Sequence, residues 1–365
     1  MGWIVLKNGM TLEGEVFGAR TETNGEFVFH TGLSGYQEIL TDPSYHRQVV
    51  VMTYPEIGNT GINPEDMESG RAWLSGFVVR SLSPVVSNWR ATTSLDQWLA
   101  DQGITGISGI DTRALTLTLR TQGAQMGIIT PDKSPDAALK KIKDLPSIDG
   151  EDLVAVVRSK APYDWTQGDW DLQGYHEGTG QGPKIAVWDF GVKNNILRML
   201  ARSGARVRVF PSGGSHKELL AWNPDGILLS NGPGDPRAVP DIVREVKAIL
   251  GAKPILGICF GHQLLGQATG GSIEKLRFGH HGANHPVRDE STGKVEITSQ
   301  NHNYAVIPSS DVTVSHINLN DKSVEGIYSA RYKAQGIQYH PEASPGPWDS
   351  HYLFDTFLRA AAGKA

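Results

Sequence analysis

The sequence predicts a two-domain α/β protein: a mixed, strand-rich N-terminal α/β domain, then a C-terminal domain with a mainly parallel sheet flanked by helices. Three observations support this prediction. The length of 365 residues suits two domains of ordinary size. Short alternating segments dominate the first part of the chain. In the second part, nearly continuous apolar strands alternate with helical segments.

The composition indicates a globular fold and argues against two kinds of partner. Hydrophobic residues make up 39% of the chain and charged residues 20%, which is unlike a disordered segment. The net charge of -5 and the lack of a Lys/Arg run argue against nucleic acid. Because no apolar stretch approaches the roughly 20 residues that span a bilayer, and the first residues do not resemble a signal peptide, we expect no membrane partner and a cytoplasmic location.

Residues 1–160 are expected to form the N-terminal domain. Its predicted strands are the alternating segments WIVLK, LEGEVF, EFVFH, QVVVMTY and SGFVVR. One helix is predicted over 111–123, ending at Gly123. A second is predicted over 134–145, where Ser134 can cap and Pro135 can take the first helical position.

Residues 161–183 are rich in Gly, Asp and Gln without a sustained period, so we expect a linker there. The C-terminal domain then covers 184–365. Its predicted parallel strands are KIAVWDF, ARVRVF, DGILLS and PILGI, separated by helical segments that include one ending at Ser203 and one near 238–250. Ligands of such sheets bind beyond the carboxyl ends of the strands, so functional residues are expected there.

The single cysteine, Cys259, lies where a predicted strand runs directly into a predicted helix. Gly257 and Gly261 flank it at i-2 and i+2, as in a nucleophile elbow, which needs residues without side chains on either side of a tight turn. The N-terminal end of a helix also favours a thiolate. A lone cysteine is more often a buried structural residue, but the flanking glycines favour a nucleophile.

A base for this thiol is available in the segment AQGIQYHPEAS. His340 ends its strand-like part and can carry the proton, and Glu342 can orient the imidazole and stabilise the imidazolium. A surface histidine beside a solvated glutamate is the alternative. The position of His340 at a strand end favours the catalytic interpretation.

A third loop, LLSNGPGDP at 228–236, also follows a predicted buried strand. Peptide N–H groups of Gly232 or Gly234, together with that of Phe260, could stabilise the oxyanion that forms when a thiolate attacks a carboxamide. The alternative for this loop is an ordinary tight turn.

Together, GICFGHQ, LSNGPGDP and YHPE resemble the motifs of triad-type glutamine amidotransferases. The resemblance implies that Cys259, His340 and Glu342 hydrolyse the side-chain amide of glutamine. The N-terminal segment TGLSGYQEILTDPSYHRQVVVMTYPEIGNTGIN, with FGHHGANHPV and QNHNYAV later in the chain, is similar to the small subunit of carbamoyl-phosphate synthase over nearly the whole length.

The family resemblance also implies a set of glutamine-binding residues. These are Ser44 from the N-terminal domain and Gly232, Gly234, Phe260, Gln263, Asn301, Asn303 and Tyr304 from the C-terminal domain. Family members often have Gly, Phe and Leu where this chain has Asn303, Tyr304 and Phe260. A backbone contact tolerates these changes, provided that Asn303 adopts any positive φ that the site requires.

Two other sequence patterns resemble binding sites only in part. His280, His281 and His285 could suggest a metal, but neighbouring strand residues point to opposite faces and the nearby acids lack a ligand spacing, so we expect no metal. The glycines at 178, 180 and 182 resemble a phosphate loop only superficially. They precede a strand instead of following one.

The resemblance further implies a large synthetase subunit that receives the ammonia and makes carbamoyl phosphate, for arginine and pyrimidine biosynthesis, from bicarbonate and ATP. We therefore expect no cofactor on this chain, with ATP and Mg on the partner, and leave a higher oligomer of heterodimers open. Two alternatives remain: the amidotransferase subunit of a different synthase, and a scaffold subunit without glutaminase activity.

Overall fold

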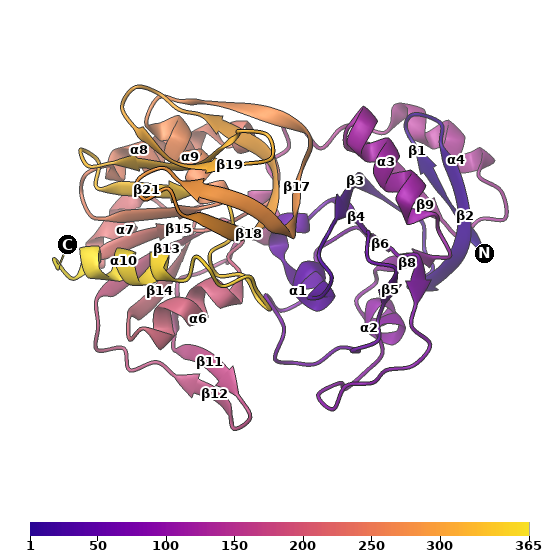
Figure 1. The fold of residues 1–365 in the computed structure, drawn as a ribbon, viewed down its shortest axis with the longest axis horizontal. Helices are drawn as coiled ribbons and strands as arrows, with labels where there is room; N and C mark the ends of the chain where they lie inside the picture. Colours follow the sequence, from indigo (N-terminus) through magenta and orange to yellow (C-terminus); the bar gives the residue numbers. More distant parts are fainter. Residues whose placement is uncertain (365) are drawn as a thin grey trace. The chain divides into compact units, whose positions relative to one another are not determined.

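The computed structural model describes residues 1–364, which divide into two compact units. The N-terminal unit comprises Met1–Asp149 and Arg277–His281, and the C-terminal unit comprises Gly150–Leu276 and Gly282–Ala365. Figure 1 shows the elements of both. None of the helices in the described part of the chain has the length and apolarity that a membrane crossing requires.

The N-terminal unit is a closed barrel in the order β1-β2-β8-β6-β4-β3-β9. Its strands are β1 Gly2–Leu6, β2 Thr11–Gly18, β3 Thr23–His30, β4 Gln48–Met52, β6 Gly76–Val78, β8 Thr105–Ser108 and β9 Gln125–Thr130. The pairs β3–β4, β4–β6 and β6–β8 are parallel and the other pairs are antiparallel, which confirms the mixed, strand-rich prediction.

Short helices and strands complete this unit. They are α1 Tyr36–Thr41, η1 Pro43–Tyr45, α2 Leu95–Asp101, α3 Thr112–Gln122, α4 Asp136–Lys141, η2 Ile142–Asp144, β5 Glu56–Ile57 and β7 Ser81–Leu82. The helix α3 begins after Asp111, whose side chain caps it, and ends at Gly123 as predicted. The helix α4 begins one residue later than expected, because Pro135 takes the cap position.

The C-terminal unit contains a ten-stranded sheet in the order β10-β14-β13-β15-β16-β21-β20-β19-β17-β18. Five neighbouring strands are parallel: β14 Arg206–Pro211, β13 Lys184–Asp189, β15 Gly226–Leu229, β16 Ile255–Ile258 and β21 Ala334–Ile337. Antiparallel strands extend it on both sides: β10 Tyr163–Trp165, β17 Ser272–Asp289, β18 Val295–Ile307, β19 Thr313–Asn318 and β20 Val324–Ser329.

Helices cover both faces of the parallel strands. They are α5 Val154–Val157, α6 Asn194–Arg202, α7 His216–Ala221, η3 Pro236–Ala238, α8 Pro240–Ile249, α9 Phe260–Ala268 and α10 Tyr352–Ala361. On one face Val187 packs in a core cluster with residues of α6 and α10, and on the other Ala186 packs with residues of α7, α8 and α9. Burial on both faces explains why these strands are continuously apolar.

The segment expected to be a linker has regular structure. Besides β10, it contains β11 Gln167–Asp171 and β12 Gly174–Glu177, which pair as a hairpin beside α6 (Figure 1). Trp165 packs against the core, and the Gln167 side chain accepts a hydrogen bond from Arg198. Because these strands have only three to five residues, their pattern is too short to stand out among the glycines.

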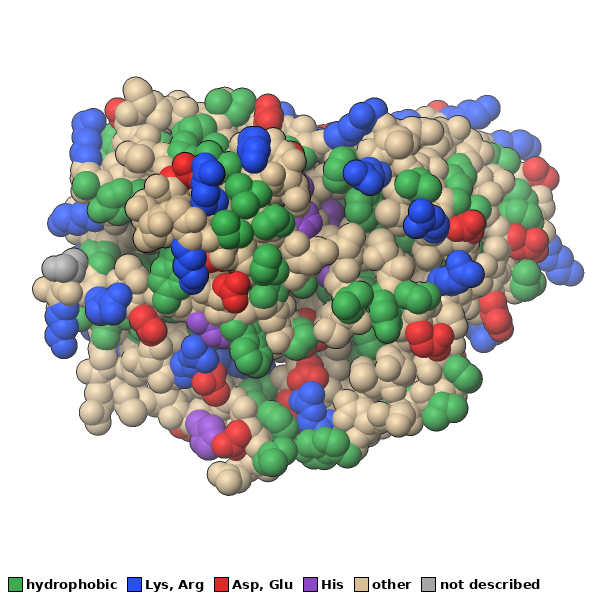
Figure 2. All heavy atoms as spheres, viewed as in Figure 1, with side chains coloured by type: hydrophobic (Ala, Val, Ile, Leu, Met, Phe, Trp, Pro, Cys, Tyr) green, Lys and Arg blue, Asp and Glu red, His purple; other side chains and the backbone are tan. Residues whose placement is uncertain are grey.

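Acidic and basic side chains are interspersed on the face of the molecule shown in Figure 2. Neither sign forms a continuous field on that face. This distribution agrees with the small net charge of -5.

Candidate active site

Cys259 occupies the turn between β16 and α9, at the cap position of the helix. Its φ of 52° and ψ of -104° are strained for a residue with a side chain, and such conformations gather at functional sites. The residue is 2% exposed, and its amide donates to the Ile337 carbonyl of β21. The turn therefore holds the thiol at the carboxyl edge of the parallel strands.

The two flanking glycines are required by close backbone contacts. A Cβ atom on Gly261 would lie 2.2 Å from the carbonyl oxygen of Leu229, and one on Gly257 would lie 2.7 Å from that of Gly261. Both distances are too short for a side-chain carbon. The spacing that suggested an elbow in the sequence thus has a steric cause in the structure.

Replacing Gly261 with Ala is therefore expected to lower the free energy of unfolding by about 1–3 kcal/mol, because the strand or the helix must shift to admit the methyl group. Urea unfolding measures this change. Gly70→Ala is the control, because open space surrounds that glycine. Equal stability of the Gly261→Ala protein and the wild type would contradict the packing argument.

His340 and Glu342 follow β21 and are buried with Cys259 in the same unit. The Nδ1 atom of His340 lies 2.7 Å from Oε1 of Glu342. Its Nε2 atom is buried and has no hydrogen-bond partner among the described residues. The carboxylate therefore orients the imidazole through one nitrogen, and Nε2 is the nitrogen that can exchange a proton with the reacting groups.

The electrostatics of this group favour a charged imidazole. Burial opposes the charge, but the Glu342 carboxylate and the neighbouring Cys259 act in the other direction and raise the pKa of His340 to about 10. Burial likewise opposes ionisation of Glu342, but Lys193 and His340 hold the pKa of its carboxyl well below the usual range. A proton that leaves the thiol can therefore stay on His340.

Lys193 is a member of this group that the sequence analysis missed. Its Nζ atom lies 2.9 Å from Oε1 of Glu342, and both residues are buried. The Lys193 amide donates to Oδ1 of Asn231, and the side-chain amide of Asn195 donates to the Glu342 carbonyl. Lys193 follows the carboxyl end of β13. The expectation that functional residues lie beyond the carboxyl ends of the parallel strands could therefore have indicated it.

The raised pKa of His340 has a consequence for stability. Because the pKa of His340 is higher in the folded protein than its ordinary value of 6.5, the protonated imidazole stabilises the folded state. This contribution to the free energy of unfolding is complete below pH 6.5 and is lost as the pH rises toward 10. Glu342→Gln removes the carboxylate that raises the pKa, so the decrease in unfolding free energy between these pH values should disappear. Urea unfolding across this pH range measures it.

Glu245→Gln is the matched control for that experiment, because Glu245 also contacts a histidine, His216, but at a more exposed position. The control protein should keep the pH dependence of the wild type. If Glu342→Gln kept it as well, the proposed coupling between Glu342 and His340 would be wrong.

The predicted oxyanion groups lie around the same edge. Phe260 is the first residue of α9, so its N–H has no acceptor within the helix. Gly232 packs closely on Phe190, where a Cβ atom would lie 2.5 Å from the Phe190 carbonyl oxygen. Gly234 has a φ of 84°, which favours glycine. The loop conformation thus depends on both glycines.

The predicted glutamine-binding side chains of the C-terminal unit are buried, and Asn301 lies beside the thiol. Cys259 Sγ lies 3.5 Å from the Asn301 carbonyl oxygen, and Gln263 donates through Nε2 to the Tyr304 carbonyl at 2.9 Å. Gln338, which the sequence analysis missed, places its Nε2 atom 3.8 Å from Cys259 Sγ. Asn303 lies within β18 and has no positive φ, so the backbone condition raised for it does not arise.

Ser44 belongs to the N-terminal unit. It lies in η1, is 7% exposed, and donates its amide N–H to Oδ1 of Asp42. Its proposed role toward glutamine stays a prediction.

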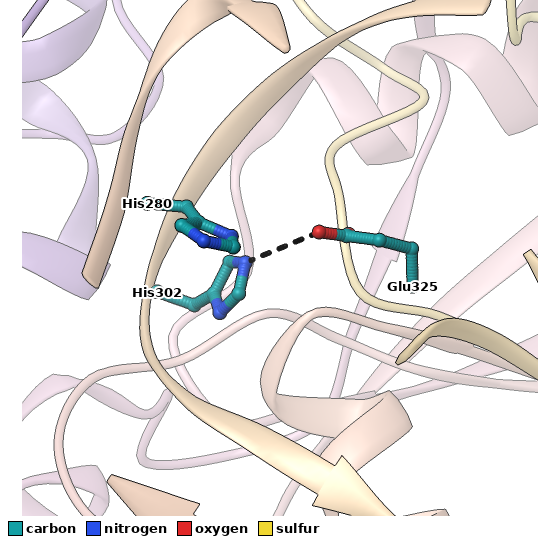
Figure 3. A group of neighbouring side chains, drawn as sticks. All are labelled: His280, His302 and Glu325. Atoms are coloured by element: carbon teal, nitrogen blue, oxygen red, sulfur yellow. Dashed lines mark ion pairs between the residues drawn. The ribbon is translucent and has the colours of Figure 1, made fainter. Parts of the chain in front are cut away.

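The histidines weighed as metal ligands all lie on β17. His302 of β18 lies 4.0 Å from Oε1 of Glu325 (Figure 3); His280, also drawn, is on the stretch of β17 grouped with the N-terminal unit. The ring nitrogens of His302 face two acceptors, the Tyr304 carbonyl at 2.8 Å and Gln300 Oε1 at 2.9 Å. Both ring nitrogens of His302 therefore have hydrogen-bond partners within the protein.

Comparison with known proteins agrees with this geometry. Residues 4–129 match the family "Carbamoyl-phosphate synthase small chain, CPSase domain", and residues 186–360 match "Glutamine amidotransferase class-I". A carbamoyl phosphate synthase small chain of Syntrophotalea carbinolica is 52% identical over 97% of this chain and 96% of its own length.

Two further relatives have the same description. The small chain of Aquifex aeolicus is 49% identical over 99% of this chain and 98% of its own length. The chloroplastic small chain of Arabidopsis thaliana is 49% identical over 97% of this chain and 84% of its own length. A strand–helix turn carries the cysteine, and the relatives align with this chain over almost its whole length. The chain therefore belongs to the carbamoyl-phosphate synthase small chain family.

Proposed function

We propose that this chain hydrolyses the side-chain amide of glutamine and supplies the ammonia to a large subunit that makes carbamoyl phosphate. The observation that carries the proposal is the strained Cys259 turn at the sheet edge beside the buried His340–Glu342 pair. Nucleophile, base and orienting carboxylate are the parts that acyl transfer requires.

The first half of the reaction forms a thioester. The thiol proton passes to His340, and the sulfur of Cys259 attacks the amide carbon of glutamine. Peptide N–H groups of Phe260 and the Gly232–Gly234 loop are suited to stabilise the oxyanion. As the C–N bond breaks, His340 returns the proton to the leaving nitrogen, and ammonia departs.

The second half regenerates the thiol. His340 accepts a proton from water as the water oxygen attacks the thioester carbon, and the sulfur leaves with that proton. Glutamate is the product. Lys193 and Glu342 hold the imidazole in one orientation through both halves, because they form a buried ion pair with the carboxylate on Nδ1.

The partner follows from the family. Relatives are named small chains of carbamoyl phosphate synthase, and a small chain implies a large one. We propose that the large subunit uses bicarbonate and ATP with Mg, and that the product feeds arginine and pyrimidine biosynthesis. A cytoplasmic location and a higher oligomer of heterodimers stay predictions.

Reconstitution with the large subunit tests the proposal. The complex should form carbamoyl phosphate from bicarbonate and ATP with either glutamine or ammonia as nitrogen donor. Activity with ammonia but not with glutamine would identify this chain as a scaffold without glutaminase activity. Failure of the chain to bind a bicarbonate-dependent ATPase would instead favour a different synthase.

A further inference from the structure

The C-terminal unit contains a hollow that Cys259 does not line. It has a volume of about 530 Å³ and is lined by residues that follow β14, by the start of α8, and by residues of the segment 152–158. The residues after β14 lie at the carboxyl edge of the parallel strands, where ligands of such sheets bind. None of the predicted catalytic or glutamine-binding residues lines it.

Arg158 is the most unusual residue of this hollow. It is partly buried, yet its guanidinium makes no hydrogen bond or ion pair with any of the described residues 1–364. The group lies against Gly213, where a Cβ atom would be 2.7 Å from its Cζ atom. A guanidinium offers five N–H donors that match an oxyanion, so its position calls for an anionic partner.

A second unsatisfied group lines the same hollow. Ser212 is 5% exposed, and its Oγ atom has no hydrogen-bond partner in the described part of the chain. A buried hydroxyl without a partner costs free energy unless a bound molecule or water satisfies it. The buried Ser212 hydroxyl therefore indicates a ligand independently of the Arg158 guanidinium.

The start of α8 adds donors. Its cap residue is Val239, which cannot cap through its side chain, and Pro240 follows. The N–H groups of Asp241 and Ile242 therefore have no acceptor within the helix, and this end of a ten-residue helix carries partial positive charge.

Acidic side chains limit the charge that the hollow can accept. Asp241 pairs with Arg244 at 2.5 Å, and Glu245 accepts from the ring of His216 at 2.7 Å. Asp152 also lines the hollow and is exposed. These carboxylates would repel a polyphosphate but leave Arg158 as an unpaired cation for a small anion.

We propose that this hollow binds a small molecule through one compact oxyanion group, a phosphate or a carboxylate. Arg158 supplies the charge, and Ser212 and the start of α8 supply further donors. The volume accommodates a small metabolite. The site is separate from glutamine hydrolysis and does not depend on that function.

Titration of the full-length chain with inorganic phosphate, and separately with acetate, tests the proposal by calorimetry at constant ionic strength. We expect saturable binding of at least one anion; comparing the two shows whether the site prefers phosphate or carboxylate. Arg158→Gln should weaken the binding by about tenfold or more, because it removes a charge-assisted contact. Ser212→Ala should weaken it less.

Arg206→Gln is the matched control, because Arg206 is an exposed arginine at the amino end of the same strand, β14. It removes the same charge and should leave anion binding unchanged. The proposal is overturned if neither anion binds saturably, or if Arg158→Gln and Arg206→Gln bind as the wild type does. Thermal unfolding of each variant verifies that it is folded.

Discussion

Replacing Cys259 with Ser should abolish glutamine-dependent synthesis while leaving ammonia-dependent synthesis intact. The hydroxyl keeps the size of the thiol but is a far weaker nucleophile beside His340, so no thioester accumulates. We expect glutaminase activity to fall by at least about 10³-fold. The measurement is carbamoyl phosphate formed by the reconstituted complex with each nitrogen source.

The ammonia reaction serves as the internal control, because it needs the complex but not the cysteine. Mass spectrometry of the wild-type chain mixed with glutamine should detect a glutamyl adduct on Cys259 that the variant lacks. Glutamine-dependent synthesis at the wild-type rate in Cys259→Ser would show that another residue is the nucleophile.

The second large effect is expected for His340→Asn. Asparagine can keep a hydrogen bond toward Glu342 but cannot carry a proton between sulfur, nitrogen and water. Loss of a general base typically costs about 10²–10⁴-fold, and we expect kcat for glutamine hydrolysis to fall within that range. Steady-state release of glutamate and ammonia measures it.

His176→Asn is the control, because His176 also lies 2.7 Å from a carboxylate, that of Asp171, but on the surface of the β11–β12 hairpin. That variant should retain full activity. If His340→Asn retained more than about a tenth of the wild-type kcat, a different group must act as the base.

Much of the site could be predicted because its residues follow strand ends. Cys259, the Gly232–Gly234 loop and His340 each begin within three residues of the end of a buried strand. The parallel order of β15, β16 and β21 brings these ends to one edge. Because neighbouring parallel strands place their carboxyl ends at the same edge of a sheet, residues that follow these strands in sequence can be predicted to lie close together in the fold.

Other features could not be predicted from local pattern. The position of Lys193 after a strand end could indicate a site residue, but nothing near it in sequence indicates that its partner in a buried ion pair is Glu342. The antiparallel extension β17–β20 is equally hidden, since its long strands contain His, Asn and Gln whose burial depends on partners far along the chain. The hollow beside Arg158 likewise depends on residues that are distant in sequence.

By itself, the sequence determined the fold class and the nucleophile turn, because steric and periodic requirements at neighbouring residues express both of them. The chemistry of amide hydrolysis came from the resemblance of its motifs to those of glutamine amidotransferases. Only the tertiary structure decided which charges meet. Burial of Lys193 against Glu342, the free Nε2 atom of His340 and the unpaired guanidinium of Arg158 arise from packing between distant segments. Electrostatic partners depend on distance and burial, and neither is a property of a local pattern.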